Sequence, residues 1–287
     1  MTGAMASASP VATWTFDAPT LALLAFAAVA YARRARTLQR RGVAVGVRRP
    51  VMFALALATL FVAFCSPIDV IGEQSLFSVH MLQHLLIGDV APLLVVLGLS
   101  GPLLRPVLAL PGVWRLHALA RPQVLLVLWA ANLYLWHVPL LYDAALAHDG
   151  IHALEHALFF TCGALLWATL LELLPGPRWY GSGAKLLSLA FVWVAGGVLS
   201  NVFLWSGRAF YDPYRDAPRL WGLDPVADQR LGGGLMLLEM SVVVIAVAIV
   251  LGVRWLAESE RRQQLLELGW EPARADRAVR YGGRLES

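Results

Sequence analysis

Charge is scarce in this sequence, and its scarcity decides the class of protein. Charged residues make up 15% of the 287 residues and hydrophobic residues 59%, whereas a soluble globular chain carries about 25% charge. So few charged groups could not cover the surface of a water-soluble fold of this length. The same figures exclude disorder, collagen and a coiled coil. The composition therefore predicts an integral membrane protein.

Cysteine and lysine are also nearly absent. The two cysteines, Cys65 and Cys162, lie in different hydrophobic runs and do not make a disulfide framework. Lys185 is the one lysine among 23 basic residues, an arginine-rich usage that indicates a bacterial source. The net charge of +4 would suit nucleic acid, but the arginines cluster between hydrophobic runs, as membrane topology requires. We expect membrane lipid around the chain and no nucleic-acid partner.

Long hydrophobic runs are what the sequence has in abundance. A transmembrane helix needs about 20 mostly apolar residues, and seven runs meet this need. They predict an all-α integral membrane protein, with a seven-helix transmembrane domain over residues 1–257 and a cytoplasmic tail over residues 258–287. The seven runs are Ala18–Ala32, Pro50–Ser66, Gln74–Leu99, Pro122–Ala145, Ile151–Leu174, Ala184–Ser206 and Leu231–Ala257.

Charge alternates along the connections between these runs. The first, third and fifth connections and the tail hold 19 of the 23 basic residues. The segment before the first run and the second and fourth connections contain Asp and Glu but no Lys or Arg. By the positive-inside rule the N-terminus is outside and the C-terminus is cytoplasmic, as an odd number of spans requires. We expect a multi-pass protein of a bacterial plasma membrane.

Five of the seven histidines lie in predicted spans, where an ionisable group is costly and usually functional. His80 and His84 are four residues apart, as are His152 and His156, so each pair projects from one helical face. His137 lies on the span between the two pairs. At a rise of about 1.5 Å per residue, all five fall in the outer half of the membrane. The spacing predicts one pocket that holds up to five imidazoles.

The chemistry of this pocket favours a metal ion. Cys65 lies near the outer end of the second run. Imidazole together with thiolate and thioether selects copper, whereas imidazole alone also suits zinc, iron or haem. Met236, Met240 and Cys162 are interpreted as packing residues.

Two further chemistries fit the same histidines. The string from His152 to His156 matches the inverted zinc-protease pattern H-x-x-E-H, which predicts a seven-helix zinc hydrolase with Glu155 as general base. A bis-histidine haem would need one imidazole of each i, i+4 pair to face the other across the bundle. The residues alone leave zinc hydrolysis, haem binding and metal handling without catalysis open.

Three sequence blocks resemble one family. The first is Ser78–Leu86 with Ala91–Leu94 and Leu97-Gly98, similar to HMxQHLL…APxLLxLG. The second is Trp136–Pro139 with Leu141–Asp143, then His152, Glu155-His156, Phe159 and Trp167. The third is Asp228-Gln229 with Gly232–Gly234 and Met236, although Leu237 stands where an aromatic residue is expected. These blocks are similar to those of CtaG, the seven-helix cytochrome c oxidase assembly factor of Gram-positive bacteria, and the resemblance covers most of residues 14–257.

The resemblance implies a role in building the copper-containing centre of the oxidase rather than an enzymatic one. Its implied partners are the oxidase catalytic subunit and an extracytoplasmic copper donor. Our hypothesis is that Cu(I) is held by a subset of the five histidines and then passes to the oxidase subunit within the membrane. The candidate ligands are His80, His84, His137, His152, His156 and Cys65. Asp143 and Glu155 are expected to orient the imidazoles.

Overall fold

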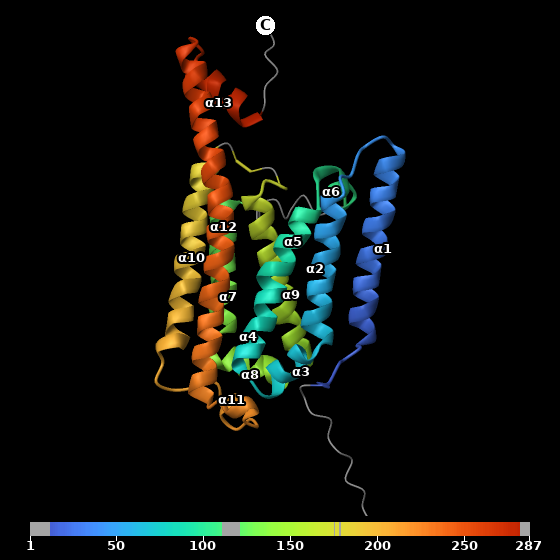
Figure 1. Cartoon of the computed structure of the whole chain (residues 1–287), viewed down its shortest axis with the longest axis vertical. Coiled ribbons are helices and arrows are strands. Elements are labelled where there is room, and N and C mark those ends of the chain that lie inside the picture. The colour runs from blue at the N-terminus through green and yellow to red at the C-terminus, as the bar shows by residue number, and fades with distance from the viewer. Residues whose placement is uncertain (1–11, 111–120, 175, 178, 282–287) are drawn as a thin grey trace, which may run out of the picture.

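The computed structural model describes residues 12–110, 121–174, 176–177 and 179–281, and their regular elements are helices (Figure 1). In chain order these are α1 (Ala18–Arg40), α2 (Arg48–Cys65), α3 (Pro67–Gln74), α4 (Phe77–Leu85), the π-helix η2 (Leu86–Val90), α5 (Ala91–Gly98), α6 (Gly101–Leu108), α7 (Pro122–Trp136), α8 (Pro139–Ala147), α9 (Asp149–Leu170), α10 (Ser182–Trp205), α11 (Asp212–Arg215), the 3₁₀-helix η4 (Leu220–Gly222), α12 (Pro225–Glu267) and α13 (Pro272–Tyr281). The long helices run side by side. The short helices α3, α8 and α11 lie at one end, which we call the α8 end, and α6 and α13 lie at the other, the α13 end.

The predicted class, an all-α protein with several apolar spans, is confirmed for the described residues. Five segments are long and apolar enough to cross a membrane, namely Arg48–Cys65, Phe77–Gly98, Asp149–Leu170, Ser182–Trp205 and Pro225–Glu267. The pair α7 and α8 makes a sixth if it is one bent span. Helix α1 does not qualify in the same way, because Arg33 and Arg34 follow an apolar stretch of about 15 residues, or about 22 Å, against a hydrocarbon core of about 30 Å.

Two predicted spans are not continuous helices. The third span begins at Phe77 rather than Gln74 and contains η2 at Leu86–Val90. Pro92 lies just beyond it and has no N–H for the carbonyl of Gly88 one turn earlier. A β-carbon at Gly163 of α9 would collide with that carbonyl oxygen. The π-helix therefore forms where a proline removes a backbone donor and a glycine lets a neighbouring helix approach closely.

The fourth predicted span is bent by 72° between α7 and α8. Val138 adopts an extended backbone conformation at the break, as expected for the residue before a proline. The chain turns there, so α8 lies across the end of the bundle (Figure 1). His137 ends α7 immediately before the bend.

Helix α12 is the longest element, with 43 residues, or about 65 Å at 1.5 Å per residue. It exceeds the thickness of a hydrocarbon core, and its last turns project beyond the other helices. The predicted domain boundary at Ala257 falls inside it. Helix α13 folds back against this projection, where Asp276 accepts a 2.5 Å hydrogen bond from Arg262 Nε. The outermost parts of the two predicted domains, residues 1–11 and 282–287, lie outside the described residues.

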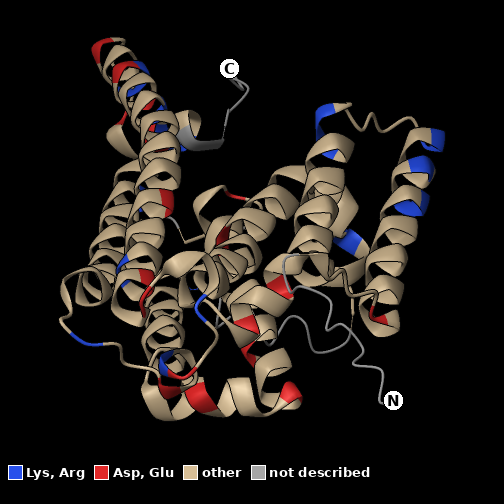
Figure 2. Cartoon of the chain, turned by 60° about the horizontal axis from the view of Figure 1, so that its bottom comes forward, with Lys and Arg blue, Asp and Glu red and all other residues tan. Residues whose placement is uncertain are grey.

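Charge differs between the two ends of the bundle. Figure 2 shows acidic residues gathered over the short helices of the α8 end and basic residues at the far ends of α1 and α2. This arrangement follows the alternation along the sequence, because successive connections lie at opposite ends. The two ends therefore offer electrostatically different surfaces.

The two largest of the four buried hydrophobic clusters among the described residues are the aromatic core and the aliphatic core. The aromatic core, at the α8 end, consists of Phe77, Met81, Leu133, Tyr142, Leu199, Phe203, Tyr211, Tyr214 and Met236. The aliphatic core, toward the α13 end, consists of Val96, Leu166, Trp167, Ala168, Leu170, Leu189, Val192, Met240, Val244 and Leu251.

Candidate metal site

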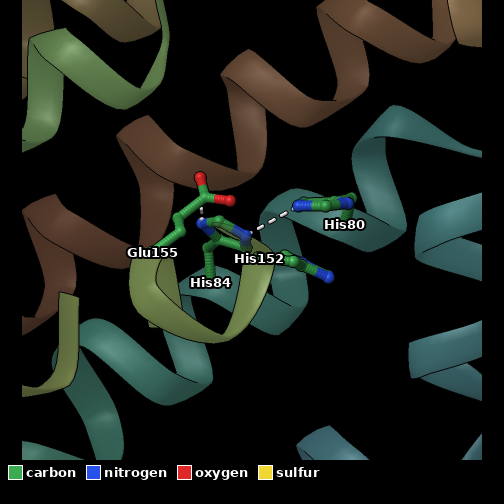
Figure 3. A group of neighbouring side chains, drawn as sticks. All are labelled: His80, His84, His152 and Glu155. Atoms are coloured by element: carbon green, nitrogen blue, oxygen red, sulfur yellow. Dashed lines mark hydrogen bonds and ion pairs between the residues drawn. The ribbon is translucent and has the colours of Figure 1, made fainter. Parts of the chain in front are cut away.

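Four buried side chains from two helices converge beside the aromatic core. His80 and His84 come from α4, and His152 and Glu155 come from α9 (Figure 3). One ligand atom of each lies within 4.8 Å of the corresponding atoms of the other three. We call these four residues the imidazole cluster. The i, i+4 spacing places His80 and His84 on one face of α4, as the sequence predicts, and the i, i+3 spacing places His152 and Glu155 on one face of α9.

The closest contact in the cluster joins two imidazoles. His80 Nε2 and His84 Nε2 are 2.6 Å apart, and His84 Nδ1 is 3.8 Å from Glu155 Oε1. Both contacts are drawn as dashed lines in Figure 3. Two imidazole nitrogens at this distance cannot both present lone pairs, so one must carry a hydrogen that it donates to the other.

Tyr214 of α11 fixes the tautomer of His80. Its hydroxyl donates to the carbonyl of Gly72 at 2.8 Å and lies 3.0 Å from His80 Nδ1. Because the hydroxyl hydrogen is used by Gly72, the network places a proton on His80 Nδ1, which donates to the tyrosine oxygen. The Nε2 lone pair of His80 is then directed into the cluster, and His84 Nε2 donates to it.

Glu73 of α3 does the same for His152. Glu73 Oε1 lies 3.0 Å from His152 Nδ1, and the negative charge of this carboxylate favours a hydrogen on that nitrogen. His152 Nε2 is then left with its lone pair, and it is buried with no hydrogen-bond partner among the described residues. An imidazole that donates from one nitrogen to an oxygen and keeps the other nitrogen free is the usual arrangement of a metal-binding histidine.

The beginning of α12 holds these elements in place. The carboxylate of Asp228 accepts hydrogen bonds from the backbone N–H groups of Phe77 at 2.7 Å and Ser78 at 3.1 Å. It thereby caps the first turn of α4, whose backbone donors would otherwise be unsatisfied. The neighbouring Gln229 accepts from Phe210 N at 2.8 Å and donates to Arg208 O at 3.0 Å. One dipeptide therefore positions both the histidine helix and the loop that leads to Tyr214.

Helix α3 covers the cluster at the α8 end. Gln83 of α4 donates to Asp69 Oδ1 at 2.7 Å and to Ala63 O at 3.0 Å, which ties α3 and α2 to the histidine helix. Burial, and next the charge of Glu73, raise the pKa of Asp69 to about 6. A carboxylate-bearing helix therefore lies between the imidazoles and the surrounding solvent.

The two other predicted histidines border the cluster without joining it. The ring of His156 lies 4.1 Å from that of His152 and 5.0 Å from that of His84, measured between centroids. His137 Nδ1 donates to Leu133 O at 2.7 Å. The Nε2 atoms of His137 and His156 are both buried and have no hydrogen-bond partner among the described residues.

Cys65 and Asp143 are not members of the imidazole cluster. Cys65 is buried at the end of α2 and is not one of the four grouped residues. Asp143 of α8 interacts electrostatically with Asp212 and Arg215, at the beginning and end of α11. Glu73 and Tyr214, which contact the cluster directly, were not predicted. The one signal for them is their position in the short connections of the α8 end.

Comparisons with known proteins identify a family and several relatives. The sequence model of the cytochrome c oxidase caa3 assembly factor family matches residues 29–258, which include the whole imidazole cluster. Uncharacterized proteins of Mycobacterium bovis and Mycobacterium tuberculosis are each 29% identical over 274 residues, or 87% of this chain. An uncharacterized protein of Mycobacterium leprae is 24% identical over 268 residues, or 86% of this chain. The chain spans 40% of the length of each of these relatives. No solved structure matches.

Proposed function

The chain belongs to the cytochrome c oxidase caa3 assembly factor family, and on that premise we propose that it carries copper for the oxidase at the imidazole cluster. The observation that supports this proposal is the convergence of His80, His84, His152 and Glu155 within 4.8 Å. Three imidazoles suit a borderline or soft transition metal far better than Mg²⁺ or Ca²⁺. Copper is the cargo, which the oxidase catalytic subunit receives within the membrane.

We assign the ligand roles from the hydrogen-bond network. His80 and His152 present Nε2 lone pairs, because Tyr214 accepts from His80 Nδ1 and the Glu73 carboxylate beside His152 Nδ1 favours a hydrogen there. His84 donates from Nε2 in the metal-free arrangement and must release that hydrogen before it can bind through the same atom. The carboxylate of Glu155, 3.8 Å from His84 Nδ1, then stabilises the opposite tautomer electrostatically, because that tautomer carries its hydrogen on Nδ1. Capture and release of the cargo are thus coupled to a tautomer change in one ring.

The orientation is part of the same proposal. We place α1 as a seventh span, the N-terminus outside, and residues 258–287 in the cytoplasm of a bacterial cell. The α8 end then faces outward, where the carboxylates of α3 attract a cation from an extracytoplasmic copper donor. A reporter enzyme fused after Ser287 should behave as cytoplasmic. Activity typical of the outer side would contradict the orientation.

Haem and zinc hydrolysis receive less support from the geometry. The His80 and His84 rings lie 4.4 Å apart and the His80 and His152 rings 5.4 Å apart, between centroids. Imidazoles packed in this way leave no room for a porphyrin between them. Glu155 is directed at an imidazole of α4, as expected for a group that orients a ligand. A Soret band, or bound zinc with hydrolytic turnover, would favour these alternatives.

Copper titration of the full chain in detergent tests the proposal. His80→Gln combined with His152→Gln should weaken Cu(I) binding at the cluster by more than about 100-fold, since loss of a mere orienting group already costs 10–100-fold. The matched control is His148→Gln, because His148 is exposed and lies one helical turn before His152. Full copper occupancy in the double variant would contradict the proposal.

A further inference from the structure

A cavity at the α13 end is lined by the first turn of α10, the projecting part of α12, helix α13 and the segment after α9. Its volume is about 610 Å³, within the range of about 300–1,000 Å³ that is typical of sites for organic ligands. Trp179 and Trp255 stand in its wall and are 54% and 48% exposed. We call this space the α13 cavity. The charged residues of its wall are Glu172, Glu258, Arg262, Asp276 and Arg277.

The α13 cavity lies at the boundary of the membrane. Helix α10 has 24 residues, or about 36 Å, against a hydrocarbon core of about 30 Å, and its first residues line the cavity. Trp255 follows Arg254 at the point where α12 changes from apolar to charged residues. Tryptophan is enriched where the lipid headgroups lie. The cavity is therefore at the depth of the headgroups of one leaflet.

Some of the charged groups in the wall stabilise the fold. Lys185 of α10 is 2% exposed, and its Nζ lies 2.5 Å from Glu172 Oε1. This pair holds the segment after α9 against α10. Arg262 of α12 pairs with Asp276 of α13. These two ion pairs therefore form the walls of the cavity and are not available for a ligand.

The two remaining charges have opposite sign. Glu258 and Arg277 take part in no ion pair among the described residues. A guanidinium such as that of Arg277 binds phosphate oxygens, and the first turn of α10, which no described side chain caps, also attracts an anion. The carboxylate of Glu258 suits an ammonium group, and an aromatic ring such as that of Trp255 attracts the same cation. The wall therefore suits a ligand that carries both a phosphate and an ammonium group.

An open apolar groove lies farther along the same two helices, toward the middle of the membrane. Its volume is about 630 Å³, and its wall includes Trp193, Val198, Val202 and Leu237.

The groove and the α13 cavity lie on the same side of the pair formed by α10 and α12. A β-carbon at Gly183, beside the cavity, would lie 3.5 Å from Trp255 Nε1, and one at Gly197, in the groove, 3.9 Å from Leu237. Gly197 follows Gly183 by 14 residues, and Trp255 follows Leu237 by 18, which is close to four and to five whole turns. A headgroup in the cavity would therefore have an apolar surface below it for an acyl chain.

We propose that the α13 cavity and the groove bind one zwitterionic phospholipid with a primary ammonium group, of the phosphatidylethanolamine class. Arg277 binds its phosphate, Glu258 binds its ammonium group, and one acyl chain lies in the groove. An anionic headgroup fits less well, because the cavity wall has three carboxylates and two guanidinium groups. The proposed orientation places this lipid in the cytoplasmic leaflet, whereas the binding itself depends neither on the orientation nor on copper.

Native mass spectrometry of the purified, delipidated full chain tests the proposal. The probes are phosphatidylethanolamine and phosphatidylglycerol with identical acyl chains. The wild-type chain should bind one phosphatidylethanolamine about tenfold more tightly than phosphatidylglycerol, the effect of one hydrogen bond between charged groups. Glu258→Lys should reverse this preference, and a reversal cannot result from misfolding. Glu260→Lys, at an exposed position outside the cavity wall on the same helix, is the control and should keep the preference. Equal binding of both lipids by the wild type, or an unchanged preference in Glu258→Lys, would overturn the proposal.

Two further variants separate the phosphate contact from the acyl chain. Arg277→Gln should weaken both lipids about tenfold, with Arg261→Gln, an exposed arginine of α12 outside the wall, as control. Gly197→Leu should weaken phosphatidylethanolamine by filling the groove. Its control is Ala246→Leu, which adds the same apolar bulk at an exposed position of α12 outside the groove. Unchanged binding in Arg277→Gln or Gly197→Leu would overturn the proposed contacts.

Two other occupants are outcomes of the same test. O-phosphoethanolamine, the headgroup without acyl chains, should bind far more weakly than the lipid, and equal affinity would overturn a lipid as the ligand. A chain that binds no lipid but forms a dimer that Gly197→Leu disrupts would assign the groove to a second copy of the chain and overturn the proposal.

Discussion

Helix α9 has two different kinds of interior along its 22 residues. Its first half buries His152, Glu155 and His156, and its second half buries Leu166 and Leu170 among other residues of the aliphatic core. Burial of a polar group costs free energy unless hydrogen bonds compensate, whereas burial of a leucine stabilises the fold. The comparison indicates that the α8 end buries polar side chains at some cost in stability, whereas burial of the aliphatic core stabilises the fold.

The two halves also differ in what holds them together. In the aromatic core, Tyr142 stacks on Tyr211 with ring centroids 3.8 Å apart, and Tyr211 donates to His137 O at 2.9 Å. These contacts join the short helix α8 and the segment before α11 to the long helices. The aliphatic core draws on long helices and on the segment that follows α9. The aromatic core therefore depends on the short helix α8 and the segment before α11, whereas the aliphatic core uses the segment after α9.

The largest effect is expected from a truncation in the aliphatic core, which should lower the stability of the fold without lowering copper affinity. Leu189→Ala removes a side chain of the aliphatic core that is 1% exposed, and such truncations cost about 2–5 kcal/mol. Copper affinity should change little, because the imidazole cluster lies in the other half. Equilibrium unfolding in detergent, with copper titration of the folded protein, measures both. Leu187→Ala, at a position 74% exposed on the same helix, is the control. An equal loss of copper affinity would show that the halves are not separable.

Glu155→Gln should have the opposite effect, a loss of copper affinity rather than of stability. It keeps the size of the side chain but removes the carboxylate opposite His84 Nδ1, so copper affinity should fall about 10–100-fold. Cells given excess copper should still assemble active oxidase. A general base in a hydrolase contributes about 10²–10⁴-fold to rate, and added copper would not replace it. Complete loss of oxidase that copper does not rescue would therefore favour the hydrolase.

Tyr214→Phe should lower copper affinity less than Glu155→Gln does. It removes the acceptor of the His80 Nδ1 hydrogen and the donor to Gly72 O, so His80 loses its fixed tautomer. Copper affinity should fall about tenfold, at the lower end for an orienting residue. Chelator competition measures the change, with Tyr134→Phe, a half-exposed tyrosine of α7 that donates to Ala195 O, as control. Unchanged affinity would mean that the tyrosine serves packing alone.

The smallest expected effect concerns pH. The folded chain holds the proton of Asp69 up to a pKa of about 6, against 3.8 for the ordinary side chain. Between these values the folded state binds more protons than the unfolded state, so Asp69 lowers stability as pH rises through that window. Asp69→Asn should remove this contribution. Thermal unfolding at several pH values between 4 and 7 should show a shallower decline for the variant, and parallel curves would contradict the assignment.

Much of the site was predictable because depth and helical face follow from residue spacing. The rise per residue places His80, His84 and His152 in the same half of the membrane, and the i, i+4 spacing directs each histidine pair to one face of its helix. Spacing says nothing about which helices are neighbours, and for this reason the positions of Cys65 and Asp143 relative to the cluster could not be obtained from depth alone.

The irregular elements were not predictable from periodicity. The bend after His137 and the π-helix depend on how Pro139 and Pro92 meet their neighbours, and in the second case on the close approach of Gly163. Glu73 and Tyr214 lie in connections, where no repeating pattern marks a functional side chain. The sequence therefore predicted the members of the cluster, including Glu155, but not Glu73 and Tyr214, which contact His152 and His80.

The π-helix at Leu86–Val90 also sets the angular phase of the span that contains it. One additional residue within a turn rotates everything beyond it by about 100° relative to an uninterrupted α-helix. The first half of the span can then direct His80 and His84 toward α9, while the second half presents Gly98 to the backbone of α2 at Phe53. The parts of this span before and after the π-helix can therefore pack against different helices, because the π-helix changes the rotation of one part relative to the other. Deletion of one residue from this turn would shorten the span by little but would turn one of its two faces toward lipid.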